Sequence, residues 1–245
     1  MLLAVCKLTN LTDIRNKVYL LTSTNISSFP DLNLVVEANN ALDRVTSLIM
    51  QSDGRWEWDD ENNTDLPIAT TALVANQQDY SLAITHLEVT RLEVLDNSTP
   101  TAAWHKLVPV DQRDEYQSAL VPDNSGVFGG VPVYYDKIGN SFFLYDANLT
   151  PAPNYSQAAS LKVYFKRPPS YFVTSDTTKT PGFNSLYHEL IPLWISHSYA
   201  IANGKANATL IMNQIVAKEQ ALQDDYSSRD KDDRVQLRAR PMRWN

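Results

Sequence analysis

The sequence predicts an α+β protein in which helices at both ends of the chain enclose a series of short strands. Residues 30–54 carry apolar side chains at helical spacing. In residues 66–173, apolar and polar side chains alternate with a period of two through most of the segment. In residues 184–227 the apolar side chains return to helical spacing. We therefore expect an N-terminal helix and a C-terminal helical hairpin to form a bundle. An antiparallel β-sandwich or open-barrel domain would be inserted between them, and an extended C-terminal tail would follow.

The same patterns divide the 245 residues into three parts. The helical bundle is expected to combine residues 1–58 with residues 175–228, and residues 59–174 form the inserted β-domain. Residues 229–245 have no usable period and are expected to form an extended arm. A hydrophobic fraction of 43% is typical of a folded chain that buries a real core.

Composition excludes several classes of protein. No apolar run approaches the roughly 18 residues of a membrane span. The first ten residues lack a basic segment and a small-residue cleavage site, so we expect no signal peptide. Cys6 is the only cysteine, which excludes a disulfide framework and a cysteine-based zinc site within the chain and indicates a reducing compartment.

The charge balance argues against tight binding of nucleic acid. The chain has 21 basic and 28 acidic residues, a formal net charge of −7. Phosphate binding depends on several lysines and arginines, and an acidic surface repels DNA. This balance suits a pore through which DNA slides, and it equally suits a protein that charge simply keeps in solution.

Residues 13–21 are expected to form a short helix with Thr12 or Asp13 as its N-cap. The longer helix that follows begins at Pro30, with Ser28 as a cap before it.

The longer helix organises the chain, because one of its faces is continuously apolar. That face contains Leu34, Val35, Ala38, Ala41, Leu42, Val45, Leu48 and Ile49. Gly54 is the expected end of the helix. In residues 55–58, charged and aromatic side chains then alternate, which predicts that a strand begins directly after the helix.

Residues 59–65 form a polar loop with four carboxylates. Counted from Asp59, every second residue has a side-chain oxygen, as in a calcium-binding loop. The sixth residue, however, is Thr64, where that loop needs glycine. The twelfth is Thr70 where it needs glutamate. We therefore expect a solvated turn and no metal site.

Seven strands are expected in the β-domain, at residues 66–74, 79–84, 86–95, 104–110, 131–135, 141–145 and 161–165. The third strand should turn Leu87, Val89, Leu92 and Val94 inward, with a bulge near Arg91 where the phase changes. The fifth and sixth form a hairpin around Gly139 and Asn140. A helical turn at 111–116 and a loop at 121–130 lie between strands.

Aromatic side chains are concentrated in these strands, at Tyr134, Tyr135, Phe142, Phe143, Tyr145, Tyr164 and Phe165. Such a cluster could stack on sugars or bases. Because successive side chains of a strand point to opposite faces, only about half of these aromatic residues lie on one face of the sheet. Core packing is therefore the expectation.

The C-terminal hairpin begins with a helix that Asn184 or Ser185 caps and that runs to residue 203. Pro192 should kink this helix, because proline cannot donate a hydrogen bond to His188. Gly204 ends it, and a second helix spans residues 206–227 with Leu210, Ile211, Ile215, Leu222 and Tyr226 along one side.

The C-terminal arm is basic. Residues 229–245 hold six basic and three acidic residues, a net charge of +3 on a chain of −7, which leaves −10 for the rest. A basic arm on an acidic body is typical of a segment that a partner orders. An unstructured terminus and direct contact of its arginines with DNA are the alternatives.

No catalytic constellation is found. The four histidines (His86, His105, His188 and His197) do not have metal-ligand spacing, and there is no G-x-S-x-G motif or glycine-rich phosphate loop. We expect neither catalytic residues nor a cofactor.

Three segments carry a resemblance to a known family. Residues 38–49 read A-N-x-A-L-D-x-V-x-x-L-I, residues 52–60 read S-D-G-R-W-x-W-D-D, and residues 63–80 read N-T-D-L-P-I-A-T-T-x-L-V-x-x-Q-x-D-Y. Together they resemble the head-to-tail adaptor (connector) proteins of tailed bacteriophages, including tail-tubular-like neck proteins. In order of elements the resemblance covers residues 28–228.

The resemblance implies a structural virion protein, not an enzyme. Twelve copies would form a ring beneath the portal, join capsid to tail or to the next neck protein, and let double-stranded DNA pass through the lumen without sequence-specific binding. It would be located in the virion neck, and in host cytoplasm during assembly, with no membrane partner. The free protein is expected to be a monomer.

Two groups of residues follow as candidate contacts. The portal-docking arm would use Arg234, Leu237, Arg238, Arg240, Met242, Arg243 and Trp244. The helical wall between subunits would use Glu37, Asn40, Arg44, Gln214 and Lys218.

The alternative function is a carbohydrate- or receptor-binding β-sandwich of a phage tail, in which Trp104, Tyr134 and Tyr135 stack on sugars. The helices at both ends of the chain favour the adaptor, because a lectin-like module does not need them.

Overall fold

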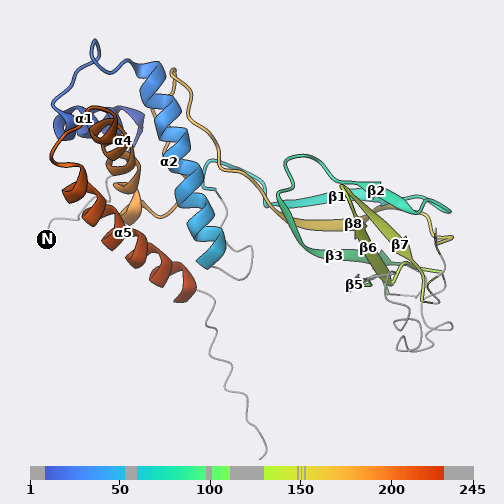
Figure 1. Ribbon diagram of the computed structural model, residues 1–245. Helices are drawn as coiled ribbons and strands as arrows, with labels where there is room; N and C mark the ends of the chain where they lie inside the picture. Colours follow the sequence, from blue (N-terminus) through green and yellow to red (C-terminus); the bar gives the residue numbers. More distant parts are fainter. Residues whose placement is uncertain are drawn as a thin grey trace, which may run out of the picture. The chain divides into compact units, whose positions relative to one another are not determined.

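The computed structural model describes residues 9–52, 60–97, 101–110, 130–147, 149, 151 and 153–228. The chain divides into two compact units: the helical unit combines residues 1–62 with 170–245, and the strand unit spans residues 63–169. Among the described residues the fold is α+β, with four α-helices, two sheets and no closed barrel, which confirms the predicted class (Figure 1).

The first helix, α1 (Leu11–Thr22), begins two residues earlier than predicted. The side-chain oxygen of Asn10 accepts a hydrogen bond from the backbone N–H of Asp13 at 3.0 Å, so Asn10 is the N-cap. The predicted caps, Thr12 and Asp13, are wrong because both lie inside the helix. Ser23 ends α1 in the left-handed region at φ 56°.

The second helix, α2 (Asp31–Ser52), buries the apolar face that the sequence predicted, apart from Leu48, which is half-buried. Pro30 lies just before its first residue, and the Pro30 carbonyl accepts from the N–H of Leu34 at 3.1 Å. Ser28 is not the cap, because its N–H and hydroxyl bond with Asn25 instead. Gly54 and the strand expected at residues 55–58 lie outside the described residues.

The C-terminal helices differ from the prediction at their start. Asn184 caps a single 3₁₀ turn, η1 (Ser185–Tyr187), and a separate helix, α4 (Leu190–Ala202), follows. The predicted kink at Pro192 is therefore wrong. Pro192 is the third residue of α4, where the N–H that proline lacks would have no intrahelical partner.

Gly204 ends α4 as predicted. It has φ 59°, and the N–H groups of Gly204 and Lys205 donate to the carbonyls of Ile201 and Ala200 at 3.1 and 2.8 Å. This is a Schellman motif. The last helix, α5 (Ala208–Ser228), buries Ile211, Ile215, Leu222 and Tyr226 but leaves Leu210 exposed.

Helix α4 lies at the centre of the helical unit and contacts α1, α2 and α5, and α2 also contacts α5 (Figure 1). Its buried apolar residues share one core with α1, α2 and α5. No helix in the described part of the chain is both long and apolar enough to cross a membrane.

The strand unit contains two four-stranded sheets. The first has the order β1-β8-β3-β4 and the second β2-β7-β6-β5. The strands are β1 (Ile68–Leu73), β2 (Asp79–Ser81), β3 (Glu88–Asp96), β4 (Ala103–Lys106), β5 (Val108–Pro109), β6 (Tyr134–Ile138), β7 (Ser141–Tyr145) and β8 (Gln157–Lys166).

One predicted strand is divided between the two sheets. Residues 104–110 were expected to form a single return strand. Instead β4 pairs antiparallel with β3, whereas β5 pairs parallel with β6 in the other sheet. Leu107 lies between them and is buried in the core. The sandwich is thus not wholly antiparallel.

The bulge predicted near Arg91 is confirmed by a register shift between Val89 and Arg91 in the pairing of β3 with β8. Leu92 and Val94 then face the core, but Leu87 is exposed and was wrongly assigned inward, because it precedes β3. The hairpin at Gly139 and Asn140 is also confirmed.

One core lies between the two sheets, with Leu92, Val94, Leu161 and Val163 from the first sheet and Tyr80, Phe142 and Leu144 from the second. The turn expected at 111–116 and most of the loop at 121–130 lie outside the described residues.

Candidate assembly surfaces

The return segment, residues 170–183, is bonded directly to α2. The side-chain amide of Asn39 donates to the carbonyl of Phe172 at 3.0 Å and accepts from the N–H of Phe172 at 2.8 Å. The Tyr171 hydroxyl donates to Asp43 Oδ1 at 2.7 Å, and this bond raises the pKa of Tyr171 to about 12. The side chain of Asn39 thus bonds to both backbone groups of Phe172, as the backbone of a neighbouring β-strand would.

Asn39 was not predicted to make this contact, although the sequence contains a signal for it. An asparagine in the interior of a long helix lowers helix propensity, because its side chain competes with the backbone for hydrogen bonds. A polar residue of this kind often has a tertiary partner. That partner here lies 133 residues away in the chain.

Asp60 corrects the prediction of a solvated acidic turn. Its side chain is buried, and it accepts from the Asn62 N–H at 2.8 Å, the Asn62 amide at 2.7 Å and the Ser170 N–H at 2.6 Å. Gly182 packs against this carboxylate with φ 83°. Three N–H donors can hold a buried carboxylate for which the described residues supply no cation. Asp60 therefore holds together the two segments of the helical unit that the strand unit separates in the sequence.

Arg44 joins three helices of one chain. Its Nε lies 3.0 Å from Glu219 Oε1, and its guanidinium lies 4.0 Å above the ring of Trp194. The indole N–H of Trp194 donates to the same oxygen of Glu219 at 3.0 Å. This predicted wall residue is therefore already engaged within its own subunit.

Lys218 is engaged in the same way. Its Nζ lies 2.9 Å from Glu189 Oε2, and Lys17 lies 3.4 Å from Glu189 Oε1. The hydrogen bond from Lys218 is the main reason that the pKa of Glu189 is below its usual value. The pair of lysines links α1 and α5 to the N-cap of α4.

The other three predicted wall residues are available for contacts. Glu37 is half-buried, whereas Asn40 and Gln214 are exposed. Within the part of the chain that the structure describes, none of the three side chains has a hydrogen-bond or ion-pair partner. They are free to bond with a second molecule.

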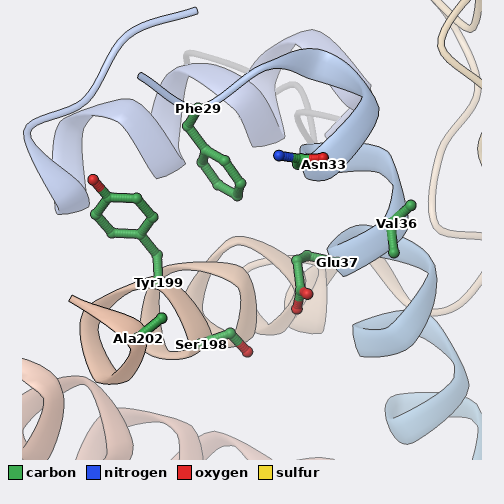
Figure 2. A pocket seen from close by; sticks show the side chains of 7 residues that line it. All are labelled: Phe29, Asn33, Val36, Glu37, Ser198, Tyr199 and Ala202. Atoms are coloured by element: carbon green, nitrogen blue, oxygen red, sulfur yellow. The ribbon is translucent and has the colours of Figure 1, made fainter. Parts of the chain in front are cut away.

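Glu37 lines a groove between α2 and α4 (Figure 2). The groove has a volume of about 270 Å³, and its lining is Phe29, Asn33, Val36, Glu37, Ser198, Tyr199 and Ala202. The rings of Phe29 and Tyr199 lie 5.4 Å apart at one end.

Exposed apolar side chains lie on both helices of this groove. Val36, which lines it, is 52% exposed, and Leu32 on α2 and Ile201 on α4 are 67% and 61% exposed. We call the groove with these three residues the α2–α4 surface. Exposed apolar area beside an unpaired carboxylate is typical of a surface that another protein covers.

The three aromatic residues of the sugar-binding alternative do not share a face. Trp104 lies on the outer face of its sheet with Lys162 Nζ 3.7 Å above its ring. Tyr134 is buried in a small cluster with Val110 and Tyr145, and Tyr135 packs edge-on against Phe142 in the main core. No common stacking platform results from these three residues.

The histidines have separate structural surroundings. His188 is buried with Nε2 2.7 Å from the carbonyl of Phe183, and burial lowers its pKa. Burial also lowers the pKa of His86, whose ring stacks on Phe165. His105 Nε2 lies 3.8 Å from Asp96, and His197 contacts Trp194. No group of three or more His, Cys, Asp or Glu suited to a metal occurs in the described ranges.

The proposed portal-docking residues, 234–244, lie outside the described residues, so their contacts stay predictions.

A family model described as SU10 adaptor protein matches residues 9–244, a range that includes residues of both units. No curated protein matches the chain.

Proposed function

The chain belongs to the SU10 adaptor family of phage adaptor proteins, and from this premise we propose that it forms the head-to-tail ring beneath the portal. The match over residues 9–244 carries the proposal, because it includes the helical unit, the strand unit and the arm. As a virion component that interacts with other virion proteins, the chain acts by assembly. The ring joins capsid to tail and extends the DNA channel.

The helical unit supplies the wall of this ring. The α2–α4 surface supports this role, as do the side chains of Glu37, Asn40 and Gln214, which have no partner among the residues that the structure describes. Arg44 and Lys218 take a revised part in the proposal: they hold α2, α4 and α5 together so that the wall keeps its shape.

The arm grips the portal. Its arginines and Trp244 combine positive charge with an aromatic anchor, and such residues dominate the energy of many protein interfaces. The chain without the arm has a net charge of −10, so a lumen built from it would not hold DNA. We propose twelve copies in the ring and no enzymatic activity.

The experiment measures binding to purified portal rings by light scattering. The full-length protein is compared with a chain ending at Ser228 and with a full-length variant carrying Arg240→Ala and Arg243→Ala. A matched control replaces two exposed lysines outside the arm, Lys137 and Lys205, with alanine, which removes the same charge.

We expect the wild type and the control to bind as a ring. The two arm variants should bind at least about tenfold more weakly, because several charged contacts are lost. Equal binding by all four proteins would remove the arm from the proposal. Absence of portal binding by the wild type, together with a signal on a glycan array, would replace the adaptor proposal with the sugar-binding alternative.

A further inference from the structure

The outer face of the β1-β8-β3-β4 sheet is basic. Because Leu92, Val94, Leu161 and Val163 point into the core, the residues between them on β3 and β8 point outward. Glu93 lies opposite Lys162 on one side and Lys106 on the other, so these three residues form one row across β8, β3 and β4.

Only part of this charge is neutralised within the sheet. Arg91 Nε lies 3.1 Å from Glu93 Oε1, and the Tyr164 hydroxyl donates to Glu93 Oε2 at 2.8 Å. Glu93 therefore already has a cation. Lys106 and Lys162 have no carboxylate partner in the described part of the chain, and Lys162 lies over the ring of Trp104.

The outer face of the other sheet has the opposite charge. Phe142 and Leu144 point into the core, so Phe143 points to the other face, where it is half-buried against the cluster of Val110, Tyr134 and Tyr145. Asp79 on β2 and Asp136 on β6 lie directly opposite Phe143, one on each side. Neither aspartate has an ion-pair partner among the described residues, and Ile138 beside them is exposed.

The two rows match in spacing as well as in charge. Lys162 and Lys106 are separated by one strand, β3, and Asp79 and Asp136 are separated by one strand, β7. Adjacent strands lie about 4.8 Å apart, so each pair of charged residues spans about 10 Å. An aromatic side chain accompanies each row: Trp104 on the basic face and Phe143 on the acidic face.

We propose that neighbouring copies in the ring associate through these faces, the basic face of one strand unit docking on the acidic face of the next. Lys106 and Lys162 then pair with Asp79 and Asp136. Because the two faces belong to opposite sides of the same sandwich, the contact is head-to-tail, and such contacts generate rings or filaments. This inference rests on the proposed ring and adds a contact between strand units to the contacts made by the helical wall.

Charge reversal of the full-length protein tests the pairing. The basic-face variant is Lys106→Glu with Lys162→Glu, the acidic-face variant is Asp79→Lys with Asp136→Lys, and a fourfold variant carries all four changes. The control, Lys137→Glu with Lys205→Glu, changes the net charge as the basic-face variant does, at exposed lysines outside the two rows. Circular dichroism establishes that each variant is folded.

Two quantities are measured: the weak self-association of the otherwise monomeric free protein, by sedimentation equilibrium at high protein concentration, and the number of copies bound to each portal ring. Each reversed face should weaken self-association at least about tenfold, since like charges then meet across the contact. The fourfold variant should recover to within about threefold of the wild type. An equimolar mixture of the two reversed variants should also associate, because each supplies the complement of the other.

Salt gives a second readout. Self-association of the wild type should weaken between about 0.05 M and about 0.5 M salt, because exposed charge pairs are screened. Reversed variants that associate as the wild type does, or a wild type that does not associate alone or on the portal, would overturn the inference.

The two proposals fail separately. Reversed variants that fill the portal ring normally overturn the inference and leave the adaptor proposal intact. A wild type that associates through the two faces but does not bind portal overturns the adaptor proposal alone.

Discussion

At the residue scale, buried polar groups with defined partners hold the N-terminal and C-terminal segments of the helical unit together. Asp60 accepts hydrogen bonds from residues on both sides of the inserted strand unit in sequence, Asn62 and Ser170. Gly182 leaves room for that carboxylate in a backbone conformation that other residues adopt at a cost. The contact therefore depends on two positions that local sequence patterns do not connect.

Gly182→Ala should destabilise the helical unit by about 2–4 kcal/mol, because the new Cβ would collide with the Asp60 carboxylate and a positive φ disfavours alanine. Urea denaturation measures the loss. The matched control is Gly204→Ala, which has φ 59° in the same unit but no atom within 4 Å of the added Cβ. It should cost only about 1–2 kcal/mol. Equal losses at the two glycines would show that the Asp60 contact contributes nothing.

His188 should make stability depend on pH. Burial holds its pKa below the ordinary value of 6.5, so the unfolded chain takes up a proton at pH values where the folded protein does not. Stability should therefore fall as the pH drops below about 6.5, by at most about 1.4 kcal/mol per pH unit.

Denaturation curves of the wild type and His188→Gln between pH 7.5 and 5.5 measure this effect. The variant should have the smaller slope. His86→Gln should also reduce the slope, since burial lowers the pKa of His86 in the same direction. A wild-type slope in His188→Gln would contradict the prediction.

At the element scale, the return segment depends on α2 for its position. Asn39 offers both a donor and an acceptor to the backbone of Phe172, and Tyr171 reaches Asp43 one helical turn further along. Contacts four residues apart on a helix lie on one face. The segment thus follows a single polar face of α2, beside the apolar face that enters the core.

Asn39→Ala should destabilise the helical unit by about 1–3 kcal/mol, because the N–H and carbonyl of Phe172 lose their partner. Hydrogen exchange should speed up at the amide of Phe172. Asn40→Ala is the control one residue away: its side chain is exposed, and the change should stay within about 0.5 kcal/mol. If Asn39→Ala leaves exchange at Phe172 unchanged, the segment is held by other contacts.

At the scale of the whole molecule, each of the two units has a main hydrophobic core of its own. The larger joins α1, α2, α4 and α5, and the other lies between the two sheets of the strand unit. A protein with two separate cores need not unfold in one cooperative step.

We expect two unfolding transitions that respond to different substitutions. Ile215→Ala removes a buried side chain from the helical core and Leu92→Ala one from the strand core, each at a cost of about 2–5 kcal/mol. Far-UV circular dichroism follows the helices, and the fluorine NMR signals of labelled tyrosines in the strand unit, such as Tyr80 and Tyr164, follow the strands. Ile215→Ala should lower only the helical transition and Leu92→Ala only the other. A single transition shifted by both variants would mean that the units unfold together.

Local patterns in the sequence determined much of this protein. Helical periodicity predicted the buried face of α2 and of α5, a lone glycine predicted the end of α4, and a change of phase predicted the bulge at Arg91. The three motif segments at residues 38–80 indicated the adaptor family, which the match over residues 9–244 confirms. These features depend on neighbours within one or two turns of chain, so the sequence displays them directly.

Only the tertiary structure decided the rest, because each remaining feature depends on a partner far away in the chain. Residues 104–110 divide between two sheets because β3 pairs with β4 and β6 pairs with β5. Asp60 is buried because Ser170 and Gly182 return to it. The matched rows of lysine and aspartate come from strand registers that no single strand encodes. Periodicity tells which side of a strand faces the core, but only pairing decides which charges lie beside one another.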